Sequence, residues 1–96
     1  MLKITVQEED KEIAITLEGR VAGPWAVELG RVWSETAPRL GKRAVSIDLR
    51  NVIFADAEGK RVLRDIYAQT HARLIANSPW AQYLAEEIRH SQAQAC

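Results

Sequence analysis

Apolar and polar residues alternate along two stretches near the start of the chain, residues 2–6 and residues 13–17. A period of two is typical of strands that bury one face. The polar residues Glu8-Glu9-Asp10-Lys11 lie between the two stretches. Two alternating segments joined by a short polar turn predict a β-hairpin.

The spacing of apolar residues becomes helical after Gly23-Pro24. Pro24 suits the first position of a helix, and Pro38 is expected to end it. Two tryptophans on one helix face could form a stacking platform for a ligand or a nucleic acid, but helical spacing and zero net charge favour packing in the core. The predicted core face carries Trp25, Leu29, Val32, Trp33 and Thr36.

The centre of the chain predicts a strand, a connection and a helix. Branched apolar residues alternate within Ala44–Leu49, and Asp56 then stands where a helix N-cap is expected. The apolar residues that follow recur at helical spacing. Gly59 lies on that apolar stripe, so we expect it to be a packing residue whose missing Cβ lets the helix approach the sheet closely.

A short apolar strand is expected over residues 72–76. A helix should follow it, with Ser78 as its cap and Pro79 as its first residue. Residues 90–96 show no pattern and are expected to be a flexible C-terminal tail. The rest of the chain, residues 2–89, is expected to be one domain.

The order of these elements predicts the fold class. After the hairpin, strands and helices alternate, which requires parallel pairing through right-handed crossovers. Because the first strands alternate in polarity, one sheet face should be covered by helices and the other only partly buried. We therefore predict an open mixed α/β sheet of about four strands, with an N-terminal hairpin, then parallel strands, and helices mainly on one face.

Composition narrows the classes of function. The 96 residues, 47% of them hydrophobic, fit one domain with a single core. Thirteen basic and thirteen acidic residues give no positive excess, so nucleic acid is not an expected partner. We recognise no secretory signal and no membrane-inserting segment, and we expect a cytoplasmic protein. A single cysteine, Cys96, excludes a disulfide within the chain.

The run Asp48–Leu63 resembles the signature of STAS domains, the fold shared by bacterial anti-sigma factor antagonists and the cytoplasmic tails of sulfate transporters. Its core is Asp56-Ala57-Glu58-Gly59. Leu17–Arg20 fits the second strand of the family and its following glycine, and Ala72–Pro79 fits the strand after the central helix and the start of the next helix. The resemblance covers residues 2 to about 88. It implies a single-domain bacterial protein that binds another protein and is not an enzyme.

One position departs from the family pattern. Antagonists of this family carry a Ser or Thr just before the glycine, which a partner kinase phosphorylates, whereas this chain has Glu58. Ala57 has no hydroxyl, and no Ser, Thr or Tyr lies between Asn51 and Arg64. The usual phosphorylation switch is therefore absent. Glu58 either imitates the phosphorylated state permanently or stabilises the start of the helix through its negative charge.

Three carboxylates near the carboxyl ends of strands, Asp48, Asp56 and Glu58, form the one set that could bind Mg²⁺. Against such a site, Asp56 is expected to cap a helix, Asp48 occupies the position of a structural family aspartate, and no glycine-rich phosphate loop follows a strand. His71 and His90 have no ligand-spaced partners, and no nucleophile and base can be paired. We expect no catalytic residue, no metal site and no cofactor.

The expected partner is a protein, bound through the loop Asn51–Ala55 and the first turns of the following helix. The resemblance implies two alternatives. The first is partner-switching signal transduction in transcription regulation, with an anti-sigma-type kinase or other signalling protein. The second is an accessory subunit bound to a transporter ATPase. The chain is expected to be a monomer or weak homodimer. The predicted contact residues are Asn51, Val52, Asp56, Ala57, Glu58, Lys60, Arg61 and Arg64.

Overall fold

The computed structural model describes residues 1–90 as four strands, three α-helices and one short 3₁₀ helix. The predicted tail begins at His90, which is the last residue of a helix, and the rest of that tail with Cys96 lies outside the described residues. In chain order the elements are β1 (Leu2–Glu8), β2 (Glu12–Val21), α1 (Pro24–Thr36), η1 (Ala37–Arg39), β3 (Ala44–Ala55), α2 (Ala57–Thr70), β4 (Arg73–Ile75) and α3 (Pro79–His90).

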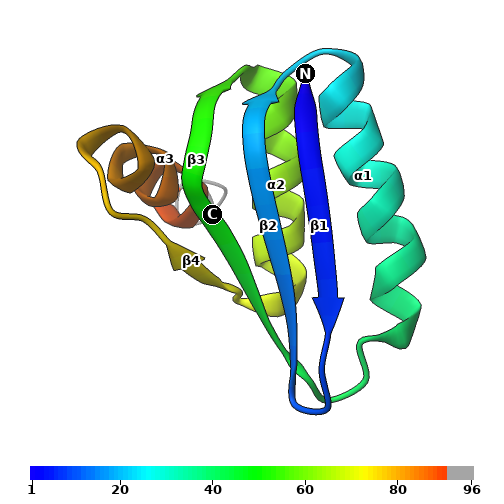
Figure 1. The fold of residues 1–96 in the computed structure, drawn as a ribbon. Coiled ribbons are helices and arrows are strands. Elements are labelled where there is room, and N and C mark those ends of the chain that lie inside the picture. Colours follow the sequence, from blue (N-terminus) through cyan, green and yellow to red (C-terminus); the bar gives the residue numbers. More distant parts are fainter. Residues whose placement is uncertain (91–96) are drawn as a thin grey trace.

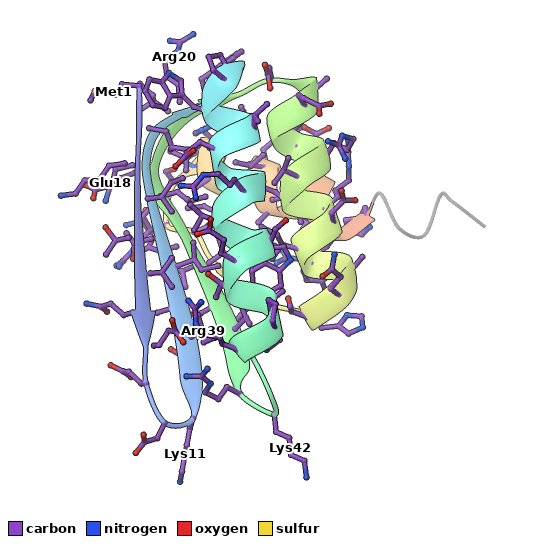
Figure 2. All side chains as sticks on the ribbon, turned by 90° about the vertical axis from the view of Figure 1, so that its right-hand side faces the viewer. Met1, Lys11, Glu18, Arg20, Arg39 and Lys42 are labelled. Carbon is purple, nitrogen blue, oxygen red and sulfur yellow. The ribbon has the colours of Figure 1, made fainter. Side chains whose placement is uncertain are left out.

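The strands form one sheet in the order β1-β2-β3-β4. β1 and β2 are antiparallel, whereas β2 with β3 and β3 with β4 are parallel. Figure 1 shows the helices behind the sheet, all on the same face. In Figure 2 the labelled Glu18 points away from the helices, into solvent on the open face. The predicted fold class, a four-stranded mixed sheet with helices on one face, is confirmed.

β1 is an edge strand, and only half of its backbone groups face a neighbour. Arg20 N donates to Met1 O (3.0 Å) and Glu9 N donates to Glu12 O (2.8 Å), one at each end of the hairpin. Hydrogen-bonded pairs in an antiparallel ladder recur at every second residue. The odd-numbered residues of β1 therefore bond to β2, and the backbone groups of the even-numbered residues point outward from the sheet.

The hydrophobic core fills the space between the sheet and the helices. Its strand residues come from the inward faces of β1, β2 and β3, as the period of two predicted. Its helix residues come from one stripe of each helix. The largest side chains that are fully buried are Ile13, Leu17, Val21, Leu29, Ile47, Leu49, Leu63, Ile66, Leu84 and Ile88.

α1 turns a slightly different face to the core from the one predicted. Trp33 is buried, with its indole nitrogen 3.2 Å from Gln69 Oε1, so the prediction of a core tryptophan is confirmed there. Trp25 is 38% exposed, and the core prediction for it is wrong. Ala26 faces the sheet at this level, in phase with the buried Leu29 and Trp33. At the first turn of α1 the small Ala26 therefore faces the sheet, and the larger Trp25 beside it is partly exposed.

The predicted loop Asn51–Ala55 is also wrong, because these residues continue β3 to Ala55. They pair with the last residues of β2, from Glu18 to Val21. Two register shifts occur along this pairing, and Ile53 has no partner on β2. An unpaired extra residue of this kind is a β-bulge, which turns a side chain out of the regular alternation. Ile53 and Phe54 are accordingly both exposed, at 68% and 39%, although they are adjacent residues of one strand.

The packing role predicted for Gly59 is confirmed. Gly59 is buried in the first turn of α2, directly against the end of β2. A Cβ added there would lie 1.9 Å from Val21 O and 2.9 Å from the carbonyl carbon of the same residue. Both are backbone atoms, so no side-chain movement could make room. The helix reaches the sheet only because this position has no side chain.

Replacing Gly59 by Ala should therefore lower the free energy of unfolding by about 1–3 kcal/mol through overpacking, although Ala is the better helix former. Gly30 in α1 is the matched control, because its nearest neighbours to an added Cβ are the methyl groups of Val62 at 4.0 Å. Gly30→Ala should raise the free energy of unfolding by about 0.5–1 kcal/mol. Urea denaturation of the two variants measures both changes, and equal effects would contradict the contact at Val21.

Candidate interaction surface

The carboxyl ends of β2 and β3 and the first turns of α1 and α2 meet at one edge of the molecule, at the top of Figure 1. Open α/β sheets generally place their binding sites at this end of the strands. The residues predicted to contact a partner lie at the end of β3 and along α2, which begins at this edge. The hydrogen bonds of Asp56 hold the elements of this edge together.

Asp56 caps α2 and also fixes the start of α1. Its Oδ1 accepts a hydrogen bond from Gly59 N at 2.7 Å, which confirms the predicted N-cap. Its Oδ2 accepts from Gly23 N at 2.9 Å, at the residue that precedes α1. Its own N–H donates to Val21 O at 3.2 Å. The hydrogen bonds from Gly59 and Gly23 hold the pKa of the Asp56 carboxyl below its ordinary value of 3.8.

Glu58 lies in the first turn of α2 and is bound by an arginine one turn further on. Arg61 Nη2 is 2.6 Å from Glu58 Oε2, and Arg61 Nε is 3.0 Å from Glu58 Oε1. The same guanidinium reaches Asp65 Oδ2 at 3.0 Å through Nη1. The hydrogen bonds from Arg61 lower the pKa of Glu58. Glu58, Arg61 and Asp65 therefore form a row of exposed ion pairs along α2, in which the charge of Glu58 is paired with that of Arg61.

Lys60 joins α2 to α3. Its ammonium lies 2.7 Å from Glu87 Oε1 and 5.8 Å from the ring centroid of Tyr83. The hydrogen bond from Lys60 lowers the pKa of Glu87, and the charge of Arg64 adds to that effect. Lys60 and Arg64 therefore lie in the contact between the two helices, whereas Arg61 is the more exposed basic residue of the predicted set.

Three further residues of the predicted set lie at the end of β3 and the start of α2. Asn51 and Ala57 are exposed. Val52 is only 3% exposed, and its carbonyl oxygen accepts a hydrogen bond from Trp80 Nε1 at 2.9 Å. Val52 therefore belongs to the core and to the contact with α3. The inward residues earlier in β3 are Ile47 and Leu49, and the register shift between Asp48 and Asn51 changes the phase of the alternation, so that the side chain of Val52 turns inward.

Sequence reasoning placed the contact in the segment Asn51–Ala55 but did not single out the exposed apolar residues within it. Ile53 is 68% exposed and Phe54 is 39% exposed, side by side at the end of β3. The guanidinium of Arg20 covers the Phe54 ring at 4.7 Å from its centroid, a cation–π contact. The one available signal was that two large apolar residues follow a complete strand pattern. We call the exposed residues of this edge the docking edge: Arg20, Asn51, Ile53, Phe54, Ala57, Glu58 and Arg61.

The carboxylates that could have formed a magnesium site are engaged elsewhere. Asp48 lies in β3 and receives Arg50 Nη2 at 2.7 Å and Arg50 Nε at 3.0 Å. Hydrogen bonds from Arg50 lower the pKa of Asp48. Asp56 accepts the two backbone hydrogen bonds described above. Among residues 1–90, no group of three His, Cys, Asp or Glu side chains is placed to hold a metal ion.

Comparisons with known proteins identify the fold. No family model matches the chain, and no curated protein sequence matches it. The structure is similar to that of an anti-sigma factor antagonist from Mycobacterium paratuberculosis, with a TM-score of 0.77 and 17% sequence identity over 98% of this chain and 82% of that one. It is also similar to part of the protein Mglu, with a TM-score of 0.62 and 20% identity over 78% of this chain and 19% of that one. The chain therefore has a STAS-like fold, as the sequence motif predicted.

In the part of the chain that the structure describes, none of the helices is both long enough and apolar enough to cross a membrane.

The hydrogen bonds of Asp56 generate a pH-dependent prediction. Because the pKa of Asp56 is lower in the folded than in the unfolded chain, its ionised form stabilises the folded state above about pH 3.8, and that contribution is lost as pH falls through the lower folded pKa. Asp56→Ala should therefore lower the urea midpoint at pH 7, by an amount that shrinks below pH 3.8. Midpoints measured from pH 7 to pH 3 test this. A difference that stays constant over the whole range would contradict it.

Proposed function

We propose that this protein is a non-catalytic interaction module that binds another protein through the docking edge. What supports the proposal most is the exposure of Ile53 and Phe54 beside the charged first turn of α2. Exposed apolar residues that adjoin one another on a small protein mark interaction sites. An arginine beside them adds a residue type that interfaces favour.

The backbone of the docking edge is held by contacts between its elements. Asp56 accepts hydrogen bonds from the starts of both α1 and α2, and the missing side chain of Gly59 lets α2 lie close to the end of β2. A surface that is already in its binding conformation loses little entropy when a partner docks. We infer that the structural aspartate and glycine of the motif position this surface, and that the exposed residues around them make the contacts.

For the class of partner, we favour partner-switching signal transduction in the bacterial cytoplasm, with an anti-sigma-type kinase or other signalling protein. The support is the likeness to an anti-sigma factor antagonist and the motif Asp56-Ala57-Glu58-Gly59. Because Glu58 replaces the phosphorylatable residue, the complex would not be released by phosphorylation at this position. In the proposed complex Glu58 contributes its charge together with Arg61.

The second candidate is an accessory subunit bound to a transporter ATPase. One observation favours it. The carboxylate of Glu58 is held by Arg61 within the helix, as expected of a residue that stabilises the first turn and not of a phosphate mimic that presents free charge. A constitutive adaptor needs no switch, and the same docking edge would serve it.

Tagged protein purified from its own cells should retain its partner, and substitutions at the docking edge should abolish that retention. Ile53→Asp places a charge in the apolar part of the edge, and Arg61→Glu reverses the exposed guanidinium. Both side chains are exposed, so the denaturation midpoint should stay nearly unchanged. Arg73→Glu reverses another exposed arginine, on β4, and is the matched control. Equal retention by all three variants would exclude the docking edge.

Glu58→Ser separates the two partner classes. It restores the hydroxyl that antagonists of this family carry and frees Arg61 from its carboxylate. If Glu58 acts as a fixed phosphate mimic, the variant should gain affinity for an anti-sigma-type kinase and incorporate phosphate from ATP. If Glu58 only stabilises the helix start, the variant should bind the native partner as before. Affinity and phosphate incorporation, measured for both forms, are the deciding quantities, and unchanged affinity without incorporation would reject the mimic.

A further inference from the structure

A second candidate site lies at the end of the sheet opposite the docking edge. Here the β1–β2 turn meets the connection between α1 and β3, at the bottom of Figure 1. Ala44 N donates to Lys11 O at 3.1 Å, which joins the two loops. An open cavity of about 530 Å³ lies between them. Its lining residues are Asp10, Lys11, Arg39, Leu40, Gly41, Lys42 and Arg43.

Two arginines hold the cavity walls in place. Arg39 Nη2 lies 2.7 Å from Glu8 Oε2, and its Nη1 donates to Glu35 O at 2.8 Å. Arg43 donates to Leu40 O at 3.2 Å and to Glu9 O at 3.1 Å, and it also contacts the carbonyl oxygen of Arg39. The contacts of Arg39 with Glu8 and of Arg43 with Glu9 O run from one loop to the other, and the remaining bonds brace the connection between α1 and β3. The walls are therefore fixed without using the lysines.

Lys11 and Lys42 make no ion pair within residues 1–90. They come from different loops, and Figure 2 shows both pointing out from the same end of the molecule. The cavity lining carries four basic side chains against one acidic side chain, Asp10, and Glu8 lies behind the arginines. The lining of the cavity therefore carries an excess of positive charge, while the adjoining β1–β2 hairpin also carries Glu9 and Glu12.

The backbone between the two walls is shaped for an anion. Leu40 has right-handed helical dihedral angles (φ −62°, ψ −46°), and Gly41 has φ +60°. A right-handed residue followed by a left-handed one turns successive N–H groups to one side, an arrangement called a nest, which binds anions. The N–H groups of Gly41 and Lys42 have no acceptor within the described residues. The space above Gly41 is open, since an added Cβ would meet nothing within 4 Å.

We propose that this cavity binds a phosphate group. The N–H groups of Gly41 and Lys42 would receive its oxygens, and the ammonium groups of Lys11 and Lys42 would close over it from the two loops. Charge-assisted hydrogen bonds of this kind are the strong class. The four basic residues surround one cavity and do not form a row, so the site fits one compact dianionic group better than an extended acidic peptide.

The test is a titration of the whole protein with inorganic pyrophosphate at low salt, followed in ¹H–¹⁵N NMR spectra. The largest saturable shifts should occur at the amides of Gly41 and Lys42. Lys11→Gln and Lys42→Gln should each weaken binding by about tenfold, the loss of one charge-assisted contact. Arg73→Gln, which removes an exposed charge on β4, is the matched control and should bind as the wild type does.

Other outcomes overturn the proposal. Shifts that do not saturate at millimolar pyrophosphate, or that spread over all exposed basic residues, would show general charge screening only. Equal weakening by Arg73→Gln would show the same. Binding of a glutamate-rich peptide that pyrophosphate cannot displace would assign the surface to an acidic protein segment. Because this end lies opposite the docking edge, none of these results depends on the outcome of the partner purification.

A second experiment, sedimentation with lipid vesicles, identifies the molecule that carries the phosphate group. Wild type and Lys42→Gln are sedimented with phosphatidylcholine vesicles that contain phosphatidic acid. Retention of the wild type alone, reversed by pyrophosphate, would confirm the phosphate site and identify a lipid headgroup as its source. Saturable binding of pyrophosphate without retention on vesicles would confirm the site and identify a soluble phosphorylated molecule.

Discussion

The structure depends on one close contact, the first turn of α2 against the last residue of β2. Val21 O accepts a hydrogen bond from Asp56 N. The same oxygen lies 1.9 Å from the place that a Cβ at position 59 would occupy, so only glycine fits there. That contact sets how near α2 lies to the sheet. Through the second carboxylate oxygen of Asp56 it also sets where α1 begins, because Gly23 N is held by the same side chain. Two helices and one strand are therefore positioned by a single aspartate and a single glycine.

This constraint explains how a surface can be both exposed and well defined. Ile53 and Phe54 are held out in solvent by a strand that is bulged immediately before the fixed turn. At the opposite end of the molecule, the cavity between the two loops is kept in shape by arginine side chains. There Arg39 and Arg43 bond to backbone carbonyls and to Glu8, and so the β1–β2 turn and the connection that contains η1 keep a defined cavity. At each end, the residues that fix the backbone are not the residues that are exposed to a partner or ligand. The two sets can therefore be substituted separately.

Local pattern was enough to predict the strands, the helices and the cap at Asp56, because each depends on residues near in sequence. The packing of Gly59 could be predicted because the residue lies on the apolar stripe of α2, although the atom that it approaches belongs to the distant Val21. It failed where pairing between distant residues decides the conformation. The end of β3 is a strand because it pairs with β2, and the bulge that exposes Ile53 exists only in that pairing. Trp25 fits the core stripe by spacing alone, but the small Ala26 is the residue that meets the sheet. Val52 was assigned to the surface with its neighbours, but the register shift that precedes it in the pairing with β2 turns it inward.

The outward backbone groups of β1 have a consequence for amide hydrogen exchange. Every second amide of this strand, at Leu2, Ile4, Val6 and Glu8, points away from the sheet, while the amides between them are bonded to β2. Exchange with deuterium along β1 is then alternately fast and slow. The side chains of the fast residues lie on the helix-covered face, since Leu2 is buried and Ile4 and Val6 pack against the core. A strand added at this edge would slow those amides first, so their exchange rates would detect such pairing directly.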